Sequence, residues 1–70
     1  MPFDYSKLRG RIVEKCQTSK VLADKIGLSA HSLSLKLNNK LFFKQNEMLL
    51  AAEVLEFPVE EIPAYFFAKS

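Results

Sequence analysis

The fold is decided by the stretch LADKIGLSAHSLS, which covers residues 22–34. Ala23 is small enough to let two helices approach closely, and Gly27 supplies the positive φ that a tight turn needs. Leu28 is an apolar residue suited to plug the corner, and Ser29 carries a hydroxyl that can cap the helix after it. The stretch therefore predicts two short helices joined at a steep angle by a tight turn.

Two helices joined in this way form a helix-turn-helix, whose second helix fits the major groove of DNA. The segment resembles the Cro/CI-type helix-turn-helix family of phage regulators, whose pattern is matched here by Leu22, Ala23, Gly27, Leu28 and Ser29. Further positions resemble small phage Cro-like regulators in particular: Leu33, Ser34, Lys36, Leu37, Asn38, Lys40, Phe43 and Glu47. The resemblance implies an all-α, compact five-helix domain of the lambda-repressor-like type.

The sequence departs from that family's pattern at three positions. Ser19 stands where Gln is usual at the start of the second helix, and Lys36 occupies a position that is usually apolar. Asn39 replaces the usual Gly after the recognition helix, and Asn tolerates the left-handed conformation. The lysine bears on the rotation of the recognition helix, and Leu37 is expected to take over its core position.

Helical periodicity continues outside the motif. Over residues 4–16 the apolar residues recur every three or four positions, at Tyr5, Leu8, Ile12 and Cys16. The helix expected at residues 45–56 places on one face Met48, Ala51, Ala52 and Leu55. A last helix is expected to begin near Pro58 and to restart at Pro63. Its inward positions are Val59, Ile62 and Phe66.

One segment is ambiguous from its pattern. Leu33, Leu35 and Leu37 alternate with polar residues, which is typical of a strand. However, Val, Ile and Thr are absent from this segment, and a lone strand would leave its backbone unpaired. We therefore predict a helix that ends at Asn38 and Asn39.

Length and charge suggest one domain with two unlike parts. The 70 residues allow a single domain, residues 1–70, with the helix-turn-helix at about 19–38 and C-terminal interaction helices at about 45–68. Residues 1–44 carry nine Lys or Arg against three Asp or Glu, whereas residues 45–70 carry one Lys against five Glu. This asymmetry suggests one surface for a polyanion and another turned away from it, although solvated helices also scatter charge by chance.

The sequence argues against several classes of function. The single cysteine, Cys16, cannot form an internal disulfide, and with His31 as the single histidine a four-ligand zinc site is not expected. No pair of catalytic groups and no phosphate-binding glycine loop is present, so we expect no enzyme, no cofactor and no small-molecule substrate. Since no apolar run approaches a membrane span, we expect an intracellular protein. The resemblance to phage regulators implies that it lies in the cytoplasm of a bacterial host.

The resemblance implies specific contacts to operator DNA. In a recognition helix at about residues 30–38, the base-contacting residues would be Ala30, His31, Ser34 and Leu35. This set lacks the Arg, Gln or Asn that read bases through paired hydrogen bonds, and His31 as a surface residue with Leu35 in the core is the alternative. Phosphate contacts are expected from Ser19, Lys20, Lys36, Lys40 and Lys44, unless the lysines are merely solvated.

The C-terminal part carries more apolar residues than a small core is expected to bury: Leu49, Leu50, Val54, Phe57, Tyr65, Phe66 and Phe67. They either complete a five-helix core or form a protein interface, which we centre on Leu50, Val54, Tyr65 and Phe67.

The function expected by resemblance is a Cro-like repressor of a phage or prophage switch that occupies double-stranded operator DNA, as a possible homodimer. The alternative is a modulator or antirepressor, of the modulator-of-repression type, that binds the phage repressor protein.

Overall fold

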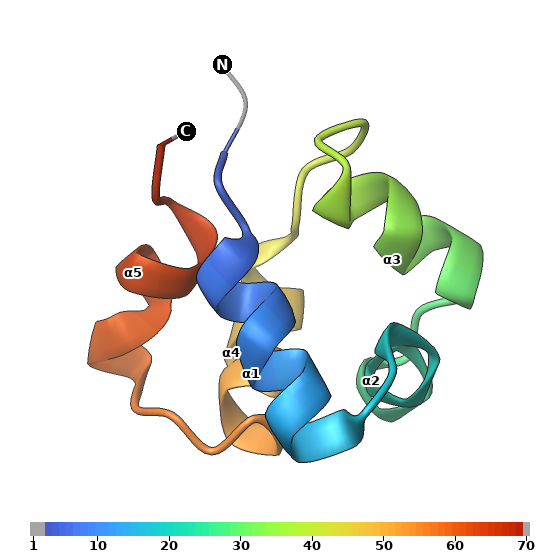
Figure 1. The fold of residues 1–70 in the computed structure, drawn as a ribbon, viewed down its shortest axis with the longest axis horizontal. Helices are drawn as coiled ribbons and strands as arrows, with labels where there is room; N and C mark the ends of the chain where they lie inside the picture. The colour runs from blue at the N-terminus through green and yellow to red at the C-terminus, as the bar shows by residue number, and fades with distance from the viewer. Residues whose placement is uncertain (1–2, 70) are drawn as a thin grey trace.

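The computed structural model describes residues 3–69, which form five α-helices and one short 3-10 helix (Figure 1). Their bounds are α1 (Ser6–Cys16), α2 (Ser19–Ile26), α3 (Ala30–Leu37), α4 (Gln45–Val54), η1 (Val59–Glu61) and α5 (Ile62–Phe66). The prediction of an all-α five-helix fold is confirmed. In the described part of the chain the one departure from it is an isolated antiparallel bridge between Phe3 and Lys69.

The helix α2 contacts α1, α3 and α4. The helix α5 packs against α1 and α4, on the side of the molecule away from α3 (Figure 1). The predicted inner face of α1 is confirmed, because Tyr5, Leu8, Ile12 and Cys16 are all buried. On α4, Ala51 and Ala52 are buried as predicted, together with Leu55 just after the helix, and Met48 packs against the core.

Residues 31–37 form a helix, so the strand alternative is wrong and the helical prediction is confirmed. Leu33 and Leu37 are buried, while Leu35 between them is half-buried. A helix can bury the first and third of these leucines because side chains four positions apart share one face. Leu37 is buried as expected, but it does not take over the position of Lys36, because the Lys36 side chain is buried as well.

The three helices α2, α3 and α4 end in the same way. Each is followed by a residue with positive φ, namely Gly27 at 79°, Asn39 at 62° and Glu56 at 60°. After each of these residues a backbone N–H reaches back to a carbonyl oxygen in the last helical turn: Leu28 to Ala23, Lys40 to Leu35, and Phe57 to Ala52. This is the Schellman termination, which satisfies carbonyl groups that the helix leaves unpaired. Asn39 therefore fulfils the role of the usual glycine, as predicted.

The structure corrects the C-terminal part of the prediction. Val59 was placed inward but is 58% exposed, because η1 is a single 3-10 turn and the α-helix begins only at Ile62. Ile62 and Phe66 are buried as predicted. Of the surplus apolar residues, Phe57, Tyr65 and Phe66 are core, and the Phe57 and Tyr65 rings stack with centroids 4.0 Å apart. The core alternative is thus correct for these three residues.

Candidate helix-turn-helix interaction site

The helix-turn-helix consists of α2, the turn at residues 27–29 and α3. Thr18 caps α2 through a 3.4 Å hydrogen bond that its hydroxyl accepts from the Val21 N–H. Ser29 caps α3 in the same way, accepting from the Ser32 N–H at 3.0 Å. Each cap satisfies a backbone donor that a helix N-terminus leaves free. The two helices therefore begin at capping residues of the kind that the sequence predicts.

The outer face of α3 carries small and weakly polar side chains. Ala30, His31 and Ser34 are exposed, and Leu35 is half-buried at its edge. These are the four predicted base-contacting residues, and the structure brings them together along one helix. Their contact with bases stays a prediction. The face offers a methyl group, an imidazole and a hydroxyl, but no long side chain able to form paired hydrogen bonds with a base edge.

Lys36 was predicted to contact phosphate, and that prediction is wrong because its side chain is buried. Its ammonium Nζ lies 3.0 Å from Glu47 Oε1, and each of the two side chains is 7% exposed. The same ammonium donates to the Phe42 carbonyl oxygen at 2.9 Å and lies 5.9 Å from the centre of the Phe43 ring. Every partner of this cation is therefore internal. Lys36 joins α3 to the following loop and to α4.

Glu47 is the other half of this arrangement. Its Oε1 atom also accepts a hydrogen bond of 2.9 Å from the backbone N–H of Lys44, the residue that precedes α4. Burial alone raises the pKa of Glu47, but the hydrogen bond from Lys44 and the hydrogen bond and charge of Lys36 outweigh it, so the pKa is lowered. Glu47 thus stays ionised and pairs with the lysine throughout the physiological pH range.

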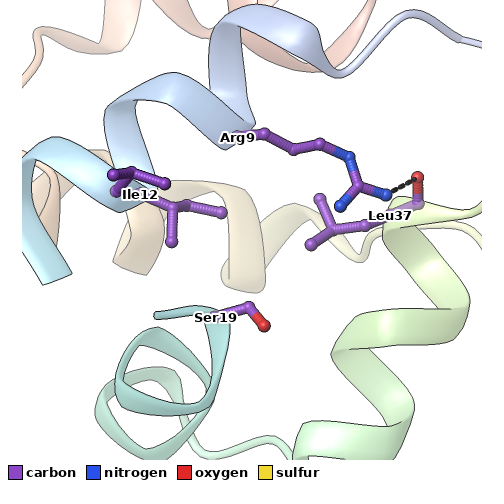
Figure 2. Close-up of a pocket in the computed structure, with 5 residues that line it drawn as sticks. Arg9, Ile12, Ser19 and Leu37 are labelled. Atoms are coloured by element: carbon purple, nitrogen blue, oxygen red, sulfur yellow. Dashed lines mark hydrogen bonds between the residues drawn. The ribbon is translucent and has the colours of Figure 1, made fainter. Parts of the chain in front are cut away.

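A small cavity of about 170 Å³ lies between α1 and the helix-turn-helix, and Figure 2 shows Arg9, Ile12, Ser19 and Leu37 around it. Arg9 reaches across from α1 and donates to the Leu37 carbonyl oxygen at 3.1 Å and to Asn38 Oδ1 at 3.2 Å. A guanidinium at the C-terminal carbonyls of a helix is favoured by both hydrogen bonding and the helix dipole. Arg9 therefore fixes the end of α3, a role that the sequence alone did not indicate.

Other cations of the basic part are also engaged inside the molecule. Arg11 donates to the carbonyl oxygens of Leu55 and Glu56 at 2.8 and 2.9 Å, and so caps the end of α4. Lys15 lies 3.5 Å from a Glu56 carboxylate oxygen at the surface. Arg9, Arg11 and Lys36 thus have structural roles. The charges of Arg11 and Lys36 are paired with Glu14 and Glu47, so part of the positive charge in residues 1–44 is not available to a polyanion.

Four of the predicted phosphate contacts remain available. Ser19, Lys20, Lys40 and Lys44 are all exposed. The first two lie at the start of α2, and the lysines at 40 and 44 flank the loop after α3. Their contact with phosphate is still a prediction.

The predicted protein interface on the C-terminal part is only partly at the surface. Leu50 and Phe67 are 40% and 48% exposed, and Val54 is half-buried against the core. Tyr65 is buried, so its assignment to an interface is wrong: its ring stacks on Phe57 and lies beneath the ammonium of Lys7. A groove of about 360 Å³ between α4 and the C-terminal helices is lined mainly by apolar side chains: Met48, Leu49, Val59, Ile62, Pro63 and Phe67.

Sequence reasoning missed the most exposed large apolar side chain of residues 3–69. Phe42 is 81% exposed and follows Leu41, which is 46% exposed. The sequence indicated only that these two residues lie in the loop between two helices. Residues in a loop follow no periodic pattern, so the sequence does not show which of their side chains are exposed.

Within residues 3–69, no group of three or more His, Cys, Asp or Glu side chains is arranged to hold a metal ion. None of the helices in that range combines the length and the hydropathy that crossing a membrane requires.

The fold and the paired helices define a small all-α protein of the helix-turn-helix class, and comparison with known proteins supports this class. The chain belongs to the family described as "Protein of unknown function (DUF739)", whose sequence profile matches residues 1–69. It is similar to the modulator of repression (MOR) of the temperate bacteriophage TP901-1 from Lactococcus lactis, known from a solution structure. The two chains are 49% identical with a TM-score of 0.81, and the match covers 96% of this chain and 90% of the other. A search of curated proteins gave no match.

Proposed function

We propose that this chain is a modulator of repression in a phage genetic switch, and that it acts by binding the repressor protein through the exposed face of α3. The observation that carries the proposal is the chemistry of that face. Ala30, His31 and Ser34 are exposed, and Lys36, which would have supplied a cation, is buried against Glu47. A face of this kind suits contact with a protein better than readout of bases.

The similarity to the TP901-1 modulator of repression supports the same proposal. Pairing of Lys36 with Glu47, and of Arg11 with Glu14 and the carbonyl oxygens at the end of α4, supports it further, since DNA binding depends strongly on cations that can reach phosphates. Binding to the repressor would change repression without any catalytic step.

The test is a pair of titrations by fluorescence anisotropy. One uses the purified repressor encoded beside this chain, and the other uses labelled DNA of the intergenic region between the two genes. We expect binding to the repressor, and no binding to the DNA at about 0.15 M salt, where the Debye length is about 8 Å. Binding of the chain alone to this DNA, with no binding to the repressor, would contradict the proposal.

A matched pair of variants locates the surface. Ala30→Tyr adds a bulky ring to the exposed face of α3, whereas Ala64→Tyr adds the same ring to an exposed position on α5. We expect the first variant to lose repressor binding and the second to keep it, with both folded by circular dichroism.

Occupation of operator DNA is the second candidate. Its support is the helix-turn-helix itself with the exposed Ser19, Lys20, Lys40 and Lys44 around it. In this candidate the recognition helix covers the operator and excludes polymerase or a competing repressor, and a second copy of the chain would occupy the other half-site.

A further inference from the structure

A single aromatic side chain stands out from the loop after α3. Phe42 is 81% exposed, yet its backbone is held firmly, because its carbonyl oxygen accepts a 2.9 Å hydrogen bond from the buried ammonium of Lys36. The next residue, Phe43, is buried and packs edge-on against Tyr5 and Phe66. The exposed ring thus projects from a backbone that is anchored on both sides. An aromatic group presented in a fixed position loses little conformational entropy on binding.

Phe42 lies at the edge of a groove of about 540 Å³ that runs between α3 and the loop. Leu28, Leu41 and Phe42 contribute apolar surface to this groove, and Lys36 and Glu47 also line it. We call it the Phe42 groove. Its one lining carboxylate, Glu47, is neutralised by Lys36, and the exposed Lys40 and Lys44 lie two positions before and after Phe42. The groove is therefore apolar in its walls and basic around its exposed aromatic residue.

We propose that the Phe42 groove binds an apolar protein segment that carries carboxylates at its edges, with Phe42 as the central anchor and Lys40 and Lys44 as its charged rim. This inference rests on the proposed function, and it places the segment on the repressor protein. Charge complementarity identifies the occupant: the exposed lysines favour an acidic partner, and the exposed aromatic group requires an apolar pocket.

Two other occupants fit the groove less well. DNA would satisfy Lys40 and Lys44, but a phosphate backbone offers no apolar pocket for Phe42. A second copy of the chain would offer the exposed Val59 beside the acidic Glu60 and Glu61. That contact would join two different surfaces, and unless its rotation closed into a ring the result would be an open filament.

The test compares three substitutions in a titration against the purified repressor. Phe42→Ser removes the anchor, Phe42→Leu keeps an apolar side chain, and Phe67→Ser removes an exposed phenylalanine that does not line the Phe42 groove. We expect Phe42→Ser to weaken binding at least about tenfold, and Phe67→Ser to change it less than about twofold. Phe42→Leu is expected to fall between wild type and Phe42→Ser. Since Phe42 is exposed, the melting temperature of each Phe42 variant should stay close to that of the wild type.

A second experiment tests the role of the charges of Lys40 and Lys44. The double variant Lys40→Glu/Lys44→Glu is expected to weaken binding at low salt, and the difference from the Lys40→Gln/Lys44→Gln variant should shrink as the salt concentration rises. Equal affinity of wild type and Phe42→Ser for the repressor would overturn the proposal that the Phe42 groove binds it, while leaving the proposed function intact. Loss of self-association in Phe42→Ser, measured by sedimentation, would assign the groove to a second copy and also overturn it. Absence of any binding between wild type and repressor would overturn the proposed function itself.

Discussion

Lys36 and Glu47 form an ion pair in the interior of a very small protein, with Nζ and Oε1 3.0 Å apart and both side chains 7% exposed. The pair connects α3 to the first turn of α4. Moving two charges out of water carries a desolvation cost that only the complete set of partners offsets. Here the set is complete, since in residues 3–69 no buried side-chain nitrogen or oxygen lacks a hydrogen-bond partner.

Removing one member of this pair should be costly. Glu47→Ala leaves the Lys36 ammonium buried without its counter-charge and removes the acceptor for the Lys44 N–H, so we expect a loss of about 3–5 kcal/mol in the free energy of unfolding. The control is the double variant Lys36→Met/Glu47→Gln, which removes both charges and keeps an oxygen for the Lys44 N–H. It should recover at least half of the loss in urea denaturation. A cost below about 1 kcal/mol for Glu47→Ala would place the pair among ordinary surface ion pairs.

The stability of the protein should depend on Glu47 in acid. Its pKa is lower in the folded state than in the unfolded chain, so its contribution is present above the ordinary glutamate value of about 4.3 and is lost as the pH falls through the folded value. We expect the stability difference between wild type and Glu47→Gln to shrink as the pH falls below about 4.3. The pKa of Asp4 is also lowered, by hydrogen bonds from the Ser6 hydroxyl and backbone N–H, but this group is common to both proteins and cancels. A constant difference across this range would contradict the role of Glu47.

The C-terminal apolar residues should separate into interface and core. Leu50→Glu and Phe67→Glu, made separately, change exposed positions, so each variant should stay folded and lose any self-association of the wild type in sedimentation. Tyr65→Ala removes a buried ring that stacks on Phe57, and it should lower stability by about 3–5 kcal/mol. If the two glutamate variants fold and keep every association of the wild type, the exposed apolar surface of α4 and α5 has no partner.

Any affinity for DNA should be limited by the lysines that remain free. With Lys36 buried, the three predicted lysine contacts are Lys20, Lys40 and Lys44, so the slope of log affinity against log salt should be no steeper than roughly −3 per monomer. Lys40→Ala should reduce this slope by about 1, whereas Lys36→Met should leave it unchanged. A smaller slope in Lys36→Met would show that its ammonium reaches phosphate, against its position in the structure.

The helices and their ends could be predicted from the sequence because each depends on local chemistry. Ser29 accepts a hydrogen bond within its own turn, and Gly27 and Asn39 adopt the positive φ values that stop two helices. The rotation of α3 was the open point, and it was resolved by a contact with Glu47, eleven positions away on another helix. A lysine on a helix is predicted to be exposed unless a carboxylate partner elsewhere in the fold is known.

The candidate site was less predictable for the same reason. Exposure of Ala30, His31 and Ser34 follows from helical periodicity, but the assignment of Arg9 to the end of α3 depends on how α1 packs across it. The choice between core and interface for Tyr65 depended on its stacking partner, Phe57, and on Lys7 of α1. Such choices are set by tertiary packing, which leaves no repeating pattern in the sequence.

The buried thiol of Cys16 can be used to measure local unfolding of the native protein. It is the chain's single cysteine, and it is 6% exposed on the inner face of α1. A thiol-specific reagent can therefore label the native protein only during the brief fluctuations that expose this part of the core. The labelling rate, compared with that of the unfolded chain, measures how often those fluctuations occur. Because no residue has to be replaced, the same measurement with and without a partner shows whether binding at α3 suppresses motion at the C-terminal end of α1.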